Sequence, residues 1–175
     1  MSAEQQKQNL RILAIGLVTL IIDQFTKVLI QRSLLLGEER IIVDGFFRLV
    51  HWGNTGAAWS LFKDNNSVLT GIALIAVVAL FYNRRHFEVH RPLGQVAMGL
   101  MMGGIIGNLI DRFRVNHVVD FLYFYTHQRD GGEIGFPAFN VADSAICSGV
   151  GLLLLLSWQR DAKDSEKRSM EAPGT

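Results

Sequence analysis

The sequence of 175 residues contains a single cysteine, Cys147, and therefore cannot form an intrachain disulfide. It also has little net charge: 17 Lys and Arg residues against 16 Asp and Glu residues give +1, which does not favour nucleic acid as a partner. A Gly-x-Ser-x-Gly nucleophile elbow is absent, and the five histidines are scattered along the chain. We therefore expect neither a metal nor any other cofactor.

Four apolar runs, nearly free of charge, approach the roughly 20 residues that a helix needs to cross a bilayer. They are apolar on every side, whereas a soluble core helix needs only one apolar stripe. In lipid each backbone polar group must be paired within its own segment, so we expect helices. The sequence predicts four transmembrane helices in a single domain over residues 1–160, with spans at about 10–30, 67–82, 93–112 and 140–158.

Basic residues mark three of the connecting segments: the N-terminus, the 83–92 loop and the tail that follows residue 160. Cytoplasmic loops carry an excess of Lys and Arg, so both termini are expected in the cytoplasm. Segments 31–66 and 111–140 then face outward. The polar tail, residues 161–175, is expected to be disordered.

The first outward segment has the composition of strands rather than that of a flexible linker. Residues 40–43 and 46–52 are rich in β-branched and aromatic residues, and Asp44-Gly45 between them is typical of a tight turn. We expect a small sheet on the outer surface, within about 40–62.

Ionisable groups inside a span cost roughly 2.5–3.5 kcal/mol each, so their positions need an explanation. With the predicted topology, the polar residues of separate segments all gather at the outer end of the spans. A proton relay or transporter would need polar groups through the whole depth, and the inner halves are almost free of them. The gathered residues are Asp23, Lys27, Asn54, Asn108, Asp111, Arg112, Asp120, Asn140 and Asp143.

Several of these residues also have purely structural interpretations. Asp23 and Lys27 are four residues apart on one helical face and could form an ion pair. Asp111 and Arg112 could pair with each other and fix the third span against its neighbours. A repeat of small residues just before them is typical of close helix packing; it consists of Gly99, Gly103 and Gly107.

Structural and catalytic interpretations remain open for the last three residues. Asn140 could be the N-cap of the fourth span, with Asp143 in its first turn favoured by the helix dipole. Asp120 follows two valines and precedes Phe121, an apolar setting that is unusual for a loop aspartate. Carboxylates grouped at a membrane surface could alternatively hold Mg²⁺ for lipid phosphoryl transfer.

Five segments in this order resemble the lipoprotein signal peptidases (signal peptidase II), a family of bacterial membrane aspartic peptidases. Any one of them is a weak signal, whereas five in order on four spans are specific. The segment 126–135 is longer than is usual in the family. The matching segments are Asp23-Gln24-Phe25-Thr26-Lys27, Asn54-Thr55-Gly56-Ala57-Ala58, Gly107-Asn108-Leu109-Ile110-Asp111-Arg112, Val118-Val119-Asp120-Phe121 and Phe139-Asn140-Val141-Ala142-Asp143-Ser144.

The resemblance implies an aspartic endopeptidase of the bacterial inner membrane with Asp120 and Asp143 as its catalytic pair. It implies cleavage of prolipoproteins before their diacylglyceryl-modified cysteine, near the extracytoplasmic face. The implied fold is an all-α membrane protein with an outer β-cradle and a short helix between spans three and four, and we expect a monomer in contact with membrane lipid. Supporting or substrate-binding roles are expected for Asp23, Lys27, Asn54, Gly56, Asn108, Asp111, Arg112 and Asn140.

Overall fold

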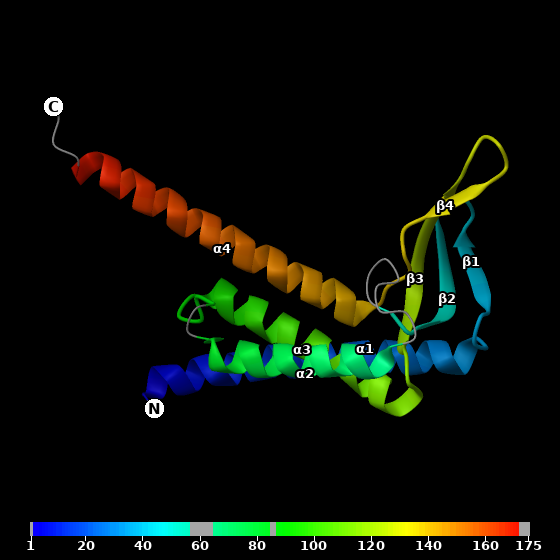
Figure 1. Ribbon diagram of the computed structural model, residues 1–175, viewed down its shortest axis with the longest axis horizontal. Coiled ribbons are helices and arrows are strands. Elements are labelled where there is room, and N and C mark those ends of the chain that lie inside the picture. The colour runs from blue at the N-terminus through cyan, green and yellow to red at the C-terminus, as the bar shows by residue number, and fades with distance from the viewer. Residues whose placement is uncertain (1, 57–64, 85–86, 172–175) are drawn as a thin grey trace.

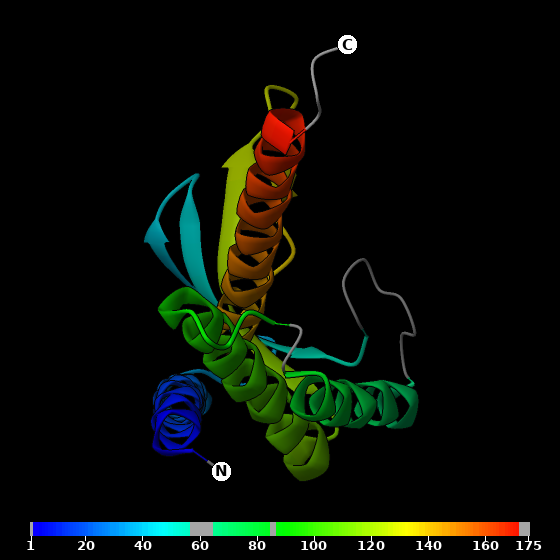
Figure 2. The ribbon, with the colours of Figure 1, turned by 90° about the vertical axis from the view of Figure 1, so that its left-hand side faces the viewer.

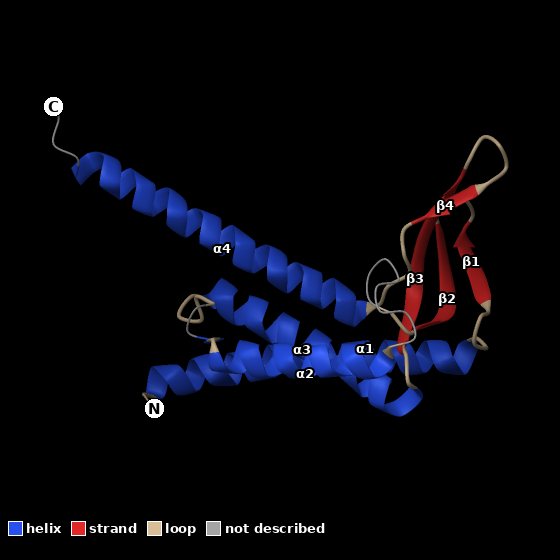
Figure 3. Ribbon diagram, in the orientation of Figure 1, coloured by secondary structure: helices blue, strands red, loops and turns tan. Residues whose placement is uncertain are grey.

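The computed structural model describes residues 2–56, 65–84 and 87–171. Long helices form most of the fold, and a small sheet lies at one end of them (Figures 1 and 3). In chain order the elements are α1 (Ala3–Ser33), β1 (Glu39–Val43), β2 (Phe47–Asn54), α2 (Asn66–Tyr82), α3 (Pro92–Val115), β3 (Val118–His127), β4 (Glu133–Gly135) and α4 (Val141–Glu171).

Three of these helices, α1, α3 and α4 up to Lys163, are long and apolar enough to cross a membrane. The helix α2 is also apolar but has only 17 residues. Large apolar side chains on their outer faces are exposed, among them Ile21, Ile75 and Leu154. Such faces need an apolar surrounding, which a bilayer provides.

The helices alternate in direction, and this alternation sorts the connecting segments (Figure 1). The helices α1 and α3 run toward the sheet, and α2 and α4 run away from it. The N-terminus, the α2–α3 connection and the far end of α4 therefore lie away from the sheet. The helix α4 starts beside the sheet and diverges from the others (Figures 1 and 2). The three basic segments of the sequence are thus at the end opposite the sheet.

Glycines on α3 allow α1 and α4 to approach its backbone closely. A Cβ atom added at Gly103 would lie 2.5 Å from the carbonyl oxygen of Gly16 on α1. One added at Gly104 would lie 2.5 Å from the carbonyl oxygen of Ala142 on α4. Real Cβ atoms do not come that near, so both contacts require glycine. The packing role predicted for the glycine repeat is confirmed.

The sheet is antiparallel, with the strand order β1-β2-β3-β4. The β1–β2 hairpin turns at Asp44–Phe46, where Gly45 has a φ of +70°, as the Asp-Gly signal predicted. In the next ladder Trp52 pairs with Asp120, so β2 fixes the position of the candidate aspartate. The part of the predicted outer β segment from residue 57 to 62 lies outside the described residues.

Two expectations about the chain are wrong. The segment between α3 and α4, all of it described, forms β3 and β4 rather than a short helix, because β3 is rich in β-branched and aromatic residues. The long segment 126–135 supplies the end of β3, a loop and β4. The helix α4 also continues to Glu171, through most of the tail that was expected to be disordered.

Candidate active site

All the polar residues that the sequence placed at one level meet at the sheet end of the bundle. Five elements contribute: the C-terminal halves of α1 and α3, the ends of β2 and β3 that pair with each other, and the first turn of α4. Most of these side chains are buried although they are charged or polar. Those exposed by less than a tenth are Asp23, Lys27, Asn108, Asp111, Asp120 and Asn140.

Asp120 lies on β3 with only 3% of its surface exposed. One carboxylate oxygen, Oδ2, accepts a hydrogen bond from Asn54 Nδ2 at 2.9 Å. The other, Oδ1, accepts one from Asn140 Nδ2 at 2.8 Å. Two neutral amides therefore fix the carboxyl group from opposite sides without supplying a compensating charge.

Asp143 lies in the first turn of α4 and is half-buried. Its Oδ2 accepts the backbone N–H of Asn140 at 3.2 Å, while its own backbone N–H donates to Asn140 Oδ1 at 2.9 Å. This reciprocal pair is a capping box, so the predicted N-cap role of Asn140 is confirmed. The second oxygen, Oδ1, accepts from Asn108 Nδ2 at 2.8 Å.

The Asn140 side chain links the two aspartates. Its oxygen caps α4 beside Asp143, and its Nδ2 donates to Asp120. The same nitrogen lies 3.3 Å from the carbonyl oxygen of Val119. In this fully buried amide the oxygen caps the helix and the nitrogen contacts Asp120. The structural interpretation of Asn140 is therefore compatible with a role beside the candidate catalytic residues.

Beneath the aspartates lies a buried ionic cluster around Lys27. The Lys27 ammonium is 2.9 Å from Asp23 Oδ2 and 2.7 Å from Asp111 Oδ2. It also donates to Asn108 Oδ1 at 2.9 Å, so each of its three N–H groups has an acceptor. The predicted Asp23–Lys27 pair is confirmed, whereas Asp111 pairs with Lys27 and not with its neighbour Arg112.

The carboxylates of this cluster also hold the backbone next to each candidate catalytic residue. Asp23 Oδ1 accepts the N–H of Ala142 at 2.9 Å, directly before Asp143. Asp111 Oδ2 accepts the N–H of Val119 at 3.2 Å, directly before Asp120. Two buried acids, neutralised in part by one lysine, thus fix the backbone on both sides of the site.

Burial of Asp120 raises its pKa to about 7, and the nearby charge of Asp143 contributes in the same direction. The hydrogen bonds from Asn54 and Asn140 oppose this rise because they stabilise the ionised form. The pKa of Asp120 therefore lies near neutral pH. Its carboxyl group can accept or donate a proton, as acid–base catalysis requires.

The sequence of this chain matches a family model described as Signal peptidase (SPase) II over residues 15–159. The chain belongs to the signal peptidase II family. It is 41% identical over 143 residues to the lipoprotein signal peptidase of Symbiobacterium thermophilum, covering 82% of this chain and 91% of that protein. It is 39% identical over 168 residues to that of Geobacter metallireducens, covering 91% and 99%.

A solved structure of a bacterial membrane enzyme, obtained by the in meso method at 2.3 Å resolution, has the same fold. It superposes with a TM-score of 0.72 at 28% sequence identity, covering 94% of each chain. A second such structure, at 1.9 Å resolution, gives a TM-score of 0.65 at 29% identity over 83% of this chain and 90% of that one. The chain is thus a membrane peptidase of the signal peptidase II type.

Two of the expected supporting residues lie at the edge of the candidate site. The backbone N–H of Gly56 donates to Asn54 Oδ1 at 2.9 Å and so orients the amide that contacts Asp120. Arg112 is half-buried, and its Nη1 lies 3.5 Å from the carbonyl oxygen of Asn108. The neighbouring Ala57 and Ala58 of the matching segment lie outside the described residues.

Gln24 belongs to the cluster although sequence reasoning gave it no role. Its Nε2 lies 3.1 Å from Asp23 Oδ2, from Asp111 Oδ1 and from the carbonyl oxygen of Gly107. The side chain therefore connects α1 to α3 beside Lys27. The signal that could have found it is its place between Asp23 and Lys27 in a matching segment.

Proposed function

We propose that this chain removes the signal peptides of bacterial prolipoproteins, cleaving before the diacylglyceryl-modified cysteine with Asp120 and Asp143 as its catalytic pair. The observation that carries the proposal is that Asn140 contacts both carboxyl groups within a signal peptidase II fold: its Nδ2 donates to Asp120 Oδ1, and its backbone N–H donates to Asp143 Oδ2. The relatives are named lipoprotein signal peptidases, which supports the substrate class.

Hydrolysis by two carboxyl groups needs one ionised and one protonated at the same pH. Burial and the mutual repulsion of the charges favour a singly ionised pair, in line with the raised pKa of Asp120. The ionised carboxylate takes a proton from a water molecule, which attacks the carbonyl carbon before the cysteine. The protonated partner donates to the carbonyl oxygen, and a proton then reaches the leaving amine.

The surrounding residues keep this pair in place in the proposed mechanism. Asn54 and Asn140 hold Asp120, and Asn108 holds Asp143 while its oxygen accepts from Lys27. Arg112 and Gly56 border the site and are proposed to contact the substrate backbone. Because one copy contains all these contacts, we propose that the enzyme acts as a monomer.

The proposed membrane orientation places the sheet end outside the cytoplasm and both termini inside it. The basic segments at the opposite end support this orientation. In it α2 is the fourth span of a single domain over residues 1–160, and the site lies at the extracytoplasmic face of the inner membrane. The two acyl chains of the substrate anchor it in the bilayer, with about 0.8 kcal/mol per buried methylene, and so hold the precursor at the level of the site.

Purified enzyme with a lipidated precursor and its unlipidated counterpart tests the proposal. Mass spectrometry should show a product that begins with the diacylglyceryl-modified cysteine, and unlipidated precursor should be cleaved far more slowly. Equal cleavage of both precursors would refute the lipid contribution. A parallel reaction with EDTA separates this mechanism from a Mg²⁺ enzyme, because chelation should leave the rate unchanged.

A further inference from the structure

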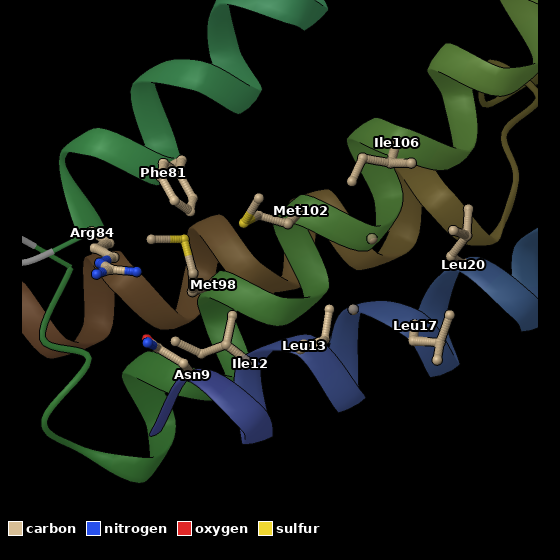
Figure 4. Close-up of a pocket in the computed structure, with 12 residues that line it drawn as sticks. Asn9, Ile12, Leu13, Leu17, Leu20, Phe81, Arg84, Met98, Met102 and Ile106 are labelled. Atoms are coloured by element: carbon tan, nitrogen blue, oxygen red, sulfur yellow. The ribbon is translucent and has the colours of Figure 1, made fainter. Parts of the chain in front are cut away.

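An apolar groove lies among α1, α2 and α3, at the end of the bundle away from the sheet. Its volume is about 440 Å³, within the 300–1,000 Å³ range of ligand pockets. None of its lining residues belongs to the candidate active site. Its long walls are α1 and α3, which pack on each other, and Phe81 near the end of α2 borders it at one end (Figure 4).

The length of the groove matches one leaflet of a bilayer. Its α1 wall extends from Asn9 to Leu20, which at 1.5 Å per residue is about 17 Å. Half of the hydrocarbon core of a bilayer is about 15 Å. In the proposed orientation the groove lies in the cytoplasmic leaflet. The choice of leaflet therefore rests on the proposed function.

The polar side chains of the groove, Asn9 and Arg84, lie together at one end, and Leu20 and Ile106 lie toward the other (Figure 4). The Arg84 guanidinium carbon lies 5.3 Å from the centre of the Phe81 ring. Among the described residues no carboxylate pairs with Arg84. The groove thus combines an apolar channel with a cation at its mouth.

We propose that this groove binds one acyl chain of an anionic phospholipid, with the lipid phosphate at Arg84. The cytoplasmic leaflet contains anionic lipids, and basic residues near its surface attract them. The apolar helix of a signal peptide would be a poorer occupant, because its basic start would lie against Arg84 and the N-terminal Lys7 and Arg11. A bound chain lies along α1 and α3, with its headgroup end beside Phe81 and Arg84.

Native mass spectrometry of the purified full-length chain in detergent tests this site, with dioleoylphosphatidylglycerol or dioleoylphosphatidylcholine added. The wild type should retain the anionic lipid preferentially. Arg84→Gln should lower that preference about fivefold, the usual effect of one basic residue at a lipid surface. Lys7→Gln removes a charge from the same end of α1 but not from the groove, and should lower the preference much less than Arg84→Gln does.

A second pair of variants tests the channel itself. Met102→Trp places a large ring in the groove and should reduce the bound amount of both lipids, whereas Val18→Trp, on the exposed outer side of α1, should not. Thermal unfolding of each variant shows whether it is folded. If Met102→Trp does not fold, Arg84→Gln still tests the site independently.

Three outcomes would overturn the proposal: equal retention of the two lipids, equal effects of Arg84→Gln and Lys7→Gln, or displacement of the lipid by a synthetic signal peptide. The lipid measurement does not depend on peptidase activity. Asp120→Asn, which should abolish cleavage, should bind phosphatidylglycerol as the wild type does. If the proposed function is wrong, the cleavage assay will show it, and the lipid-binding measurement will be unaffected.

Discussion

Asn140 is the side chain whose replacement should alter Asp120 most directly. Its Nδ2 donates to Asp120 Oδ1 at 2.8 Å, and its oxygen accepts the backbone N–H of Asp143 and caps α4. Ser is about as good an N-cap as Asn. The Asn140→Ser variant therefore removes the amide donor to Asp120 while it keeps the helix cap.

The loss of this hydrogen bond should raise the pKa of Asp120 further above its present value of about 7, because the bond stabilises the ionised carboxylate. Hydrogen bonds to charged groups contribute about 1.5–3 kcal/mol, and about 1.4 kcal/mol corresponds to one pH unit. Water can replace part of the lost bond. We therefore expect the limb of the kcat/KM profile that reports Asp120 to move up by about 1 pH unit.

The assay is steady-state cleavage of a lipidated precursor peptide in detergent, measured across the neutral pH range. The matched control is Ser144→Ala, one turn along the same helix, which loses only the hydrogen bond of its Oγ to the carbonyl oxygen of Asn140. Its profile should not move. An unchanged limb in Asn140→Ser, or an equal movement in Ser144→Ala, would refute the proposed coupling of Asn140 to Asp120.

Three further predictions concern stability, measured as Tm in detergent. Lys27→Met leaves the buried Asp23 and Asp111 without their cation and should destabilise the fold by about 3–5 kcal/mol; an unchanged Tm would contradict the ionic cluster. Gly107→Ala places a Cβ 2.5 Å from Asp23 Oδ2 and should lower Tm, whereas Gly71→Ala, with open space around it on α2, should not; similar effects of the two would argue against close packing. The pKa of Asp120, about 7, lies above its unfolded value of about 3.9, so the folded state binds more protons between these values and loses stability as pH rises. Asp120→Asn should therefore raise Tm more at pH 8 than at pH 5, and a rise that does not depend on pH would count against the buried titration.

The sequence predicted the location of the site because membrane spans must alternate in direction. Asp23 and Asn108 are far apart in the chain, yet both had to lie at the same end of their spans once the spans alternated. The contact of Lys27 with Asn108 confirms that the two segments meet. The strands β1 and β2 were predictable for a similar reason, since an Asp-Gly turn between two β-rich stretches is a local signal.

Other features depended on tertiary contacts that a single sequence does not contain. Asp111 and Arg112 are neighbours in sequence, but adjacent side chains do not face each other on a helix. Asp111 instead faces α1 and pairs with Lys27. Asp120 was interpreted as a loop residue, although it lies on β3. Its partner β2, which precedes two helices in the chain, determines its conformation.

The central claim is that Asp120 and Asp143 together perform the cleavage. The most direct measurement is the rate at which Asp120→Asn and Asp143→Asn cleave a lipidated precursor, with Asp130→Asn in the exposed β3–β4 loop as the matched control. Each of the first two variants should lose at least about 10³-fold in kcat, and the control should keep the wild-type rate. Wild-type cleavage by either Asp120→Asn or Asp143→Asn would contradict the catalytic pair.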